Sequence, residues 1–353
     1  MSLEDRVMEL AAEVPSPDQR AVVEARERHL ALSKPPGSLG RLEELGARLA
    51  GISGESLPAV PENPAVVVCA GDHGVLGRGV SPWPREVTAA MVENICAGGA
   101  AVNAIAKTVG ARVSVLDVGV AGELSRHPSL RVANVRQGTE DLSRRPAMSR
   151  EEAARAVLAG AGVAEELVES GGVDLLVTGD MGIGNTTPAA ALISAFTGRP
   201  PEETTGRGTG VDDETYDLKV GVVREALELH APDPEDPLGV LSSLGGLEHA
   251  AIVGVVLMGA TCGVPVVLDG VVSNSAALAA RSLAPDSVGY TVAGHLSAEP
   301  GARVALDALG LAPLLDLGMR LGEGTGGLLA VPLVGAAARA LGAMATLEEL
   351  GFG

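Results

Sequence analysis

Residues 173–191, near the middle of the chain, read VDLLVTGDMGIGNTTPAAA. This stretch opens with an apolar run typical of a buried strand, and it ends in an alanine-rich helical pattern. A glycine-rich turn joins the two segments. Turns of this kind present the free N–H groups at the start of a helix to an anion. The stretch therefore predicts a strand, a tight turn and a helix, with a phosphate site at the turn.

Other apolar runs of strand length lie on both sides of this stretch. They are AVVVCAG at 65–71, RVSVLDVGV at 112–120, VPVVLDG at 264–270 and SVGYTVAG at 287–294. Amphipathic segments separate them, such as 149–170, where Ser149 and Glu152 form a capping box. This alternation predicts an α/β protein with a Rossmann-like parallel sheet and helices on both faces.

The two ends of the chain show helical patterns only. We expect a small helical domain built from both termini. Residues 1–55 would form its N-terminal part, and 298–353 would supply C-terminal helices, mostly of the small domain, and an active-site loop. Residues 56–297 would form the Rossmann-like large domain.

The composition argues against several classes of protein. The formal net charge is -19 and only 1% of residues are aromatic, which disfavours nucleic-acid and anionic-membrane partners. Three scattered cysteines indicate neither a zinc site nor a disulfide framework and suit a cytoplasmic location. The uncharged stretch 250–268 contains glycines and a proline, so we expect a buried helix, a turn and a core strand there rather than a membrane span.

Polar residues stand where the predicted strands end. They are Asp72, His73, Asp117, Asp180, Asp269 and His295. Each alone is typical of any strand end. Together they predict a site at the carboxyl edge of the sheet, where open parallel sheets bind ligands.

The turn at 179–187 differs from the dinucleotide-binding fingerprint. After Gly182 and Gly184, the third glycine position holds Thr187, and no clear acidic partner follows at the expected distance. Thr187 is a good N-cap, with Pro188 in the first helical position. The turn is therefore either an anion pocket or an ordinary capped connection.

Two more glycine clusters carry charged residues. GRGTG at 206–210 adds Arg207 and Gly208, and the helix after it carries Lys219, one of three lysines in the chain. RLGEGTGG at 320–327 places Glu323 between glycines, which leave the backbone free to approach a ligand. A carboxylate in an apolar pocket makes a good general base, although a solvated glutamate in a flexible turn would show the same pattern.

These clusters together resemble the nicotinate-nucleotide–dimethylbenzimidazole phosphoribosyltransferase family. Eight stretches match in order: KPPGSLGRLEEL (34–45), AGDHGV (70–75), SPWPREVTAAMV (81–92), GDMGIGNTTPAAA (179–191), GRGTGVDDE (206–214), LDGVVSNSAAL (268–278), HLSAEPGARVAL (295–306) and MRLGEGTGGLLAVPLV (319–334). The resemblance implies transfer of the phosphoribosyl group of nicotinate mononucleotide to 5,6-dimethylbenzimidazole, giving α-ribazole 5'-phosphate and nicotinate for cobalamin assembly. It also implies no metal, no cofactor and a homodimer.

The resemblance also implies roles for single residues. Glu323 matches the catalytic glutamate. Gly182, Gly184, Asn185 and Thr186 would hold the 5'-phosphate, with Lys219 nearby and Arg207 and Gly208 as further substrate contacts. Trp83, Met91 and Leu321 would line the benzimidazole pocket. Asp180, also expected to bind substrate, stands where many relatives have glutamate, and Met91 stands where others have glutamine; these departures bear on the choice of acceptor.

Two alternatives remain open at this stage. One is a transferase of the same fold that uses another base as acceptor. The other is a non-catalytic nucleotide-binding protein, against which the Glu323 loop argues because binding alone needs no base there. A dehydrogenase lacks support because the third glycine is missing, and a diphosphate-dependent transferase lacks support because no acidic pair precedes the turn.

Overall fold

The computed structural model describes residues 1–352 and contains one six-stranded parallel sheet in the order β3-β2-β1-β4-β5-β6. The strands are β1 (Pro64–Gly71), β2 (Arg112–Gly119), β3 (Leu130–Val132), β4 (Leu175–Met181), β5 (Val266–Leu268) and β6 (Thr291–Ala293). Five of them confirm the predicted runs. The strand β3, which is only three residues long, was not predicted, and the first half of the last run forms a 3-10 helix, Pro285–Tyr290, instead of a strand.

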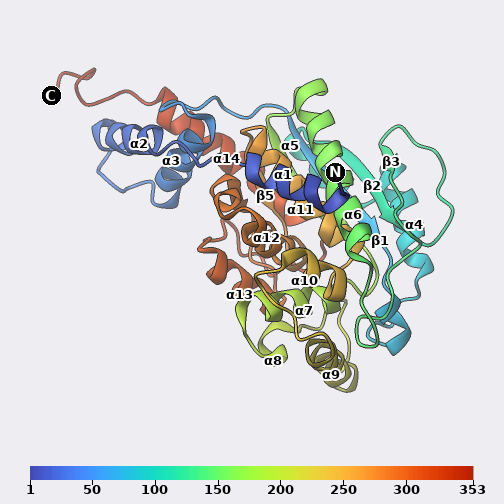
Figure 1. The fold of residues 1–353 in the computed structure, drawn as a ribbon. Helices are drawn as coiled ribbons and strands as arrows, with labels where there is room; N and C mark the ends of the chain where they lie inside the picture. The colour runs from blue at the N-terminus through green and yellow to red at the C-terminus, as the bar shows by residue number, and fades with distance from the viewer. Residues whose placement is uncertain (353) are drawn as a thin grey trace.

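The central strands β1 and β4 are buried along their whole length, because helices cover both faces of the sheet. In β1, Val67 and Cys69 point into one hydrophobic core, and Val66 and Val68 point into another. Alternate side chains of a strand face opposite sides, so a run without polar residues fits a doubly covered strand. The predicted α/β class is confirmed (Figure 1).

Three helices precede the first strand, and the others lie between the strands or after the last one. They are α1 (Leu3–Glu13), α2 (Gln19–Ala31), α3 (Arg41–Ser53), α4 (Glu86–Cys96), α5 (Ala101–Val109), α6 (Arg150–Glu165), α7 (Thr186–Thr197), α8 (Pro201–Thr204), α9 (Asp213–His230), α10 (Pro237–Leu244), α11 (Leu247–Thr261), α12 (Val271–Leu283), α13 (Pro300–Leu309) and α14 (Thr325–Ala343). The capping box of Ser149 and Glu152 is present at the start of α6.

The close packing of helices α6 and α11 depends on two glycines. A Cβ at Gly160 would lie 1.9 Å from the Ala251 carbonyl oxygen, and one at Gly254 would lie 1.8 Å from the Val157 carbonyl oxygen. Both helix backbones therefore approach more closely than any side chain allows. This contact positions the almost wholly buried α11 over the sheet. The prediction for the uncharged stretch 250–268 is confirmed, because it forms most of the buried helix α11, a turn and strand β5.

Two stretches, Glu86–Val109 and Thr325–Ala343, are apolar and long enough to pass a length-and-composition test for membrane helices. The first is broken by the turn between α4 and α5. The second is α14, which packs against α3, α5 and β4. Packing within the fold accounts for the composition of α14.

The helices of the two termini divide between two places. Helices α2, α3 and α14 pack together and project from one side of the molecule, where Ala25, Ala50 and Leu341 share a small core (Figure 1). Helices α1 and α13 instead pack against the large sheet layer, with Leu10 of α1 in its main core. We therefore propose a small bundle that begins at α2, later than the expected start at residue 1.

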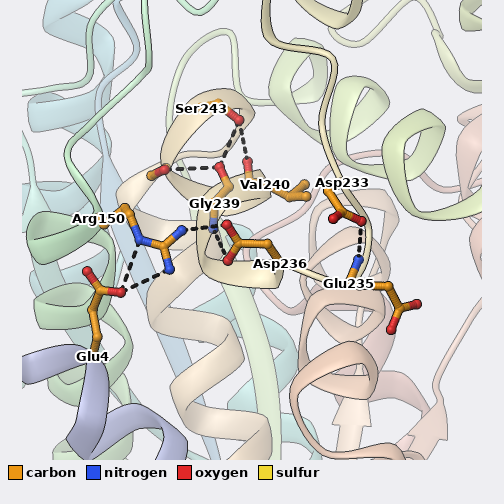
Figure 2. A network of polar contacts seen from close by, with 9 residues as sticks. Glu4, Arg150, Asp233, Glu235, Asp236, Gly239, Val240 and Ser243 are labelled. Carbon is orange, nitrogen blue, oxygen red and sulfur yellow. Dashed lines mark hydrogen bonds and ion pairs between the residues drawn. The ribbon is translucent and has the colours of Figure 1, made fainter.

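A polar network holds α1 in this position. Figure 2 shows Arg150, at the start of α6, between Glu4 of α1 and Asp236 at the start of α10. Its guanidinium donates to Glu4 Oε2 at 2.9 and 3.0 Å and to Asp236 Oδ2 at 2.6 Å. Asp236 also accepts the Gly239 N–H and so caps α10. The Arg150 side chain is 42% exposed, so this network orients α1 and adds little to stability.

Candidate active site

The site lies where the strand order reverses. β1 and β4 are neighbours, but the chain leaves β1 towards β2 and leaves β4 towards β5. In open parallel sheets this divergence opens a crevice beyond the carboxyl ends of the strands. The loops after β1 and β4 border the crevice, together with the glycine clusters at 206–210 and 320–327.

A cavity of about 410 Å³ occupies this crevice. Its lining residues are Val80, Ser81, Trp83, Val87, Met91, Asp180, Met181, Gly182, Ile183, Gly184, Asn185, Thr186, Gly208, Thr209, Lys219, Arg320, Leu321 and Glu323. The structure thus brings together every predicted site residue except Arg207, although they are spread over 241 positions from Trp83 to Glu323 (323 − 83 + 1).

Arg207 points away from the cavity. Its guanidinium stacks over the Tyr216 ring, donates to the Val211 carbonyl oxygen and pairs with Asp213. The cation that the sequence prediction missed is Arg320, which lines the cavity and donates to the Gly208 carbonyl oxygen at 2.6 Å. Its position directly before the LGEGTGG loop was the available signal.

The turn after β4 leads directly into α7. The helix begins at Thr186 with Asn185 as its N-cap, two residues earlier than the Thr187 cap that the sequence predicted. The Asn185 side chain does not cap the helix, because its amide donates to Asp180 Oδ2 at 2.8 Å. Gly184 has a φ of 90° and a Cβ at Gly182 would lie 2.3 Å from the Gly71 carbonyl oxygen, so both positions require glycine. The N-terminus of α7 therefore borders the cavity, and the free N–H groups of a helix N-terminus favour an anion.

Lys219 places an ammonium group beside the N-terminus of α7. It lies on α9, only 2% exposed, and its Nζ donates to Thr186 Oγ1 at 3.1 Å. Burial lowers the pKa of Lys219, and the nearby Glu299 carboxylate opposes that fall. An ammonium group at a helix N-terminus is a suitable binding partner for a phosphate.

Glu323 lies in the same cavity, held in an unusual backbone conformation. Its φ of 63° falls in the left-handed region, and glycines with φ of 87° and 89° flank it. Glu323 Oε2 accepts the Val102 N–H at the start of α5, at 3.2 Å. Burial raises the pKa of Glu323, the Val102 N–H lowers it and the Asp269 charge raises it. A carboxyl group with a raised pKa is suited to accept a proton near neutral pH.

Asp269 holds the loop that carries Glu323. The residue follows β5 and is fully buried. Its Oδ1 accepts the N–H groups of Gly326 and Gly327 at 2.8 and 2.9 Å, and its Oδ2 accepts the Gly324 N–H at 3.1 Å. One carboxylate thus caps α14 and sets the position of the preceding turn.

Asp180 is the penultimate residue of β4 and contacts both the turn at Gly182–Thr186 and the Glu323 loop. Its backbone carbonyl accepts the Glu323 N–H at 3.2 Å, and a Cβ at Gly322 would lie 3.0 Å from Asp180 Oδ2. Burial first, and then the Asp269 charge, raises the pKa of Asp180 to about 8, against the lowering effect of the Asn185 amide. The raised pKa favours the protonated form of Asp180.

The remaining strand-end residues support loops and do not line the cavity. Asp117 accepts the Gly119 and Val120 N–H groups, and His295 packs against Gly326 of α14. His73 lies under Gly182, where its Nε2 is 2.7 Å from Glu248 Oε1.

His249 Nδ1 is 2.9 Å from the same Glu248 oxygen, and all three side chains of this group are buried. Within residues 1–352, one group of side chains has ligand atoms close enough together to hold a metal ion, namely His73, Glu248 and His249. Burial alone would raise the pKa of Glu248, but the charges of the two histidines hold it well below its usual range. We interpret the group as a buried polar cluster that supports the turn at Gly182–Thr186 through the contact of His73 with Gly182.

The opposite wall of the cavity is apolar. Val80, Val87 and Met91 supply apolar side chains to the lining, and Trp83 and Leu321 line it while 51% and 58% exposed. A planar heteroaromatic ring fits such a wall, since flat rings bury area without needing hydrogen bonds from every side.

A second cavity of about 430 Å³ lies beside β6, lined partly by Arg26, Arg41 and Arg48. Arg26 pairs with Glu44, and the other two arginines donate to backbone carbonyl oxygens. None of the predicted site residues borders this cavity.

Fold and site together define a nucleotide-binding α/β protein in which a buried carboxylate faces an anion pocket. Residues 14–351 match the family model described as Phosphoribosyltransferase. A Salinispora tropica nicotinate-nucleotide–dimethylbenzimidazole phosphoribosyltransferase is 54% identical over 95% of both chains, and a Chloroflexus aggregans protein of that name is 52% identical over 95% of this chain and 94% of its own. A crystal structure of the protein of that name from Thermus thermophilus superposes with a TM-score of 0.90 at 49% identity, over 95% of this chain and 99% of that one.

The chain belongs to the nicotinate-nucleotide–dimethylbenzimidazole phosphoribosyltransferase family.

Proposed function

We propose that the protein transfers the phosphoribosyl group of nicotinate mononucleotide to 5,6-dimethylbenzimidazole, releasing nicotinate and forming α-ribazole 5'-phosphate for cobalamin assembly. The observation that carries the proposal is one cavity that joins three elements. These are the anion turn at Gly182–Thr186, the apolar wall around Met91 and the buried Glu323.

The donor is suited to this cavity. Its 5'-phosphate would lie on the N-terminus of α7 between Thr186 and Lys219, which supply N–H, hydroxyl and ammonium donors. Its pyridinium ring already carries a positive charge, so nicotinate leaves with a neutral ring nitrogen and the departure needs no general acid.

The acceptor requires one base. When one benzimidazole nitrogen attacks the anomeric carbon, the ring becomes cationic unless the other nitrogen loses its proton. The Glu323 carboxylate would take that proton, and Trp83, Met91 and Leu321 would hold the ring. A single base contributes about 10²–10⁴-fold, and orientation of the two bound reactants supplies the rest.

The test combines the two substrates without added metal and follows nicotinate release by chromatography. Release that needs the benzimidazole, and falls about 10²–10⁴-fold in Glu323→Gln, supports both the reaction and the base. The exposed Glu123, changed to Gln, is the matched control and should retain wild-type turnover.

Two outcomes would change the proposal. Release with another benzimidazole or a purine, but not with dimethylbenzimidazole, would favour a transferase with a different acceptor. Binding of nicotinate mononucleotide without release, whatever the base, would favour a non-catalytic nucleotide-binding protein.

The same reasoning from the family extends to assembly. We propose a homodimer, as the resemblance to that family implies. Light scattering after gel filtration tests it, and a monomer at working concentration would contradict it.

A further inference from the structure

Glu299 is a buried acid in contact with the glycine cluster 206–210, and the reaction scheme above does not use it. It is the N-cap residue of α13, 5% exposed, yet its side chain makes no capping bond to its own helix. Instead its Oε1 accepts the Gly208 N–H at 2.8 Å. A Cβ at Gly206 would lie 2.1 Å from Glu299 Oε2, so the carboxylate is in close contact with the backbone of the glycine cluster 206–210. A buried carboxylate is costly unless it is paired and hydrogen-bonded.

Lys219 is the cation that faces Glu299 across this cluster. Its Nζ lies 3.2 Å from the point where a Cβ on Gly208 would stand, so Gly208 has the carboxylate on its N–H side and the ammonium near its Cα. Burial lowers the pKa of Lys219 and Glu299 opposes this. Conversely, burial raises the pKa of Glu299 and Lys219 opposes this. Each group therefore favours the charged form of the other.

Other charged groups around the pair are few. Arg320, from the loop before Glu323, also lowers the pKa of Glu299 and donates to the Gly208 carbonyl oxygen. On α8, Glu202 and Glu203 pair with Arg224 and Arg199 at the surface. On the cluster itself, Arg207 pairs with Asp213.

We propose that Glu299 is a positioning residue of the phosphate subsite. It keeps Lys219 protonated in a nearly dry pocket, and it fixes the Gly208 backbone against which Lys219 packs. The inference rests on the proposed function, because the ligand that needs the ammonium is the donor's phosphate. Without the carboxylate, burial favours the neutral amine, which attracts a phosphate dianion only weakly.

Glu299→Gln separates the two roles, because the glutamine oxygen still accepts the Gly208 N–H while the charge is gone. KM for nicotinate mononucleotide should rise with pH as Lys219 loses its proton. In the variant this rise should begin about one pH unit lower than in the wild type, with kcat at saturation within about twofold. Glu203→Gln, which removes a surface charge on neighbouring α8, should keep the wild-type profile.

Glu299→Ala removes the hydrogen bond as well and should raise KM at every pH. If this variant does not fold, Glu299→Gln still decides the question. Coincident pH profiles of KM for Glu299→Gln and wild type would overturn the inference, as would a loss of kcat with KM unchanged.

Calorimetric titration with inorganic phosphate separates this inference from the proposed function. If the wild type releases no nicotinate, the proposed function fails, yet phosphate binding is still measurable as a function of pH. Phosphate affinity that declines at lower pH in Glu299→Gln than in wild type supports the inference. Affinity with the same pH dependence in both proteins overturns it.

Discussion

Asp269→Asn should weaken catalysis more than its distance from the reacting atoms suggests. The carboxylate accepts three N–H groups at the start of α14, and one of the three donors, Gly324, directly follows Glu323. An asparagine can keep the two bonds to Oδ1, but its Nδ2 then faces the Gly324 N–H. One charge-assisted bond is lost, about 1.5–3 kcal/mol, together with a charge at a helix N-terminus, about 0.3–1 kcal/mol.

The free energy of unfolding should therefore fall by about 2–4 kcal/mol. Because a displacement of about 1 Å at a catalytic group can cost 10²-fold, we expect kcat to fall roughly 10–100-fold with a smaller change in KM. Urea denaturation and steady-state nicotinate release measure the two effects.

Asp117→Asn is the matched control. Asp117 also is a buried carboxylate that accepts two backbone N–H groups, at 2.9 and 3.0 Å, but it supports the turn after β2 away from Glu323. This variant should lose comparable stability and keep its kcat. An unchanged kcat in Asp269→Asn, or an equal loss in Asp117→Asn, would refute the reasoning.

Two further predictions concern stability. Gly254→Ala should lower the free energy of unfolding by about 1–3 kcal/mol or more in urea denaturation, because its Cβ would overlap the Val157 carbonyl oxygen. The control Gly162→Ala places its Cβ in open space on α6 and should leave stability unchanged or raise it by up to about 1 kcal/mol. Equal losses in the two variants would contradict this reasoning. The pKa of Asp180 is raised to about 8, so between about pH 4 and 8 the folded protein holds a proton that the unfolded chain has lost. The contribution of Asp180 to the free energy of unfolding is therefore complete below about pH 4 and is lost as pH rises towards 8. The loss is at most about 1.4 kcal/mol per pH unit. Asp180→Asn should remove this pH dependence. The free energy of unfolding of the variant, relative to that of the wild type, should therefore increase with pH across this window. Parallel curves of unfolding free energy against pH for the two proteins would count against the raised pKa of Asp180.

The sequence predicted the layer structure because doubly covered strands must be apolar along their whole length. The run before Asp180 could be recognised without knowing its neighbours. The three residues of β3 could not, since so short a strand is defined only by its pairing with β2. The same limit applies to α1, whose amphipathic pattern shows that it has a buried face but not which core receives it.

For the site, the residues with intrinsic chemical character were visible in the sequence. Glycine-rich turns, a rare lysine and a glutamate between glycines each limit what the backbone or the charge can do, whatever the fold. Their assembly into one cavity, and the direction in which a side chain points, depended on tertiary contacts. Arg207 and Arg320 are alike in sequence, since each belongs to a glycine-rich stretch. Tyr216 and Asp213 hold the first outside the cavity, whereas the Gly208 carbonyl holds the second at its lining. Glu299 shows the same division, because its charge is evident from the sequence, while its position on the opposite side of Gly208 from Lys219 exists only after the chain has folded.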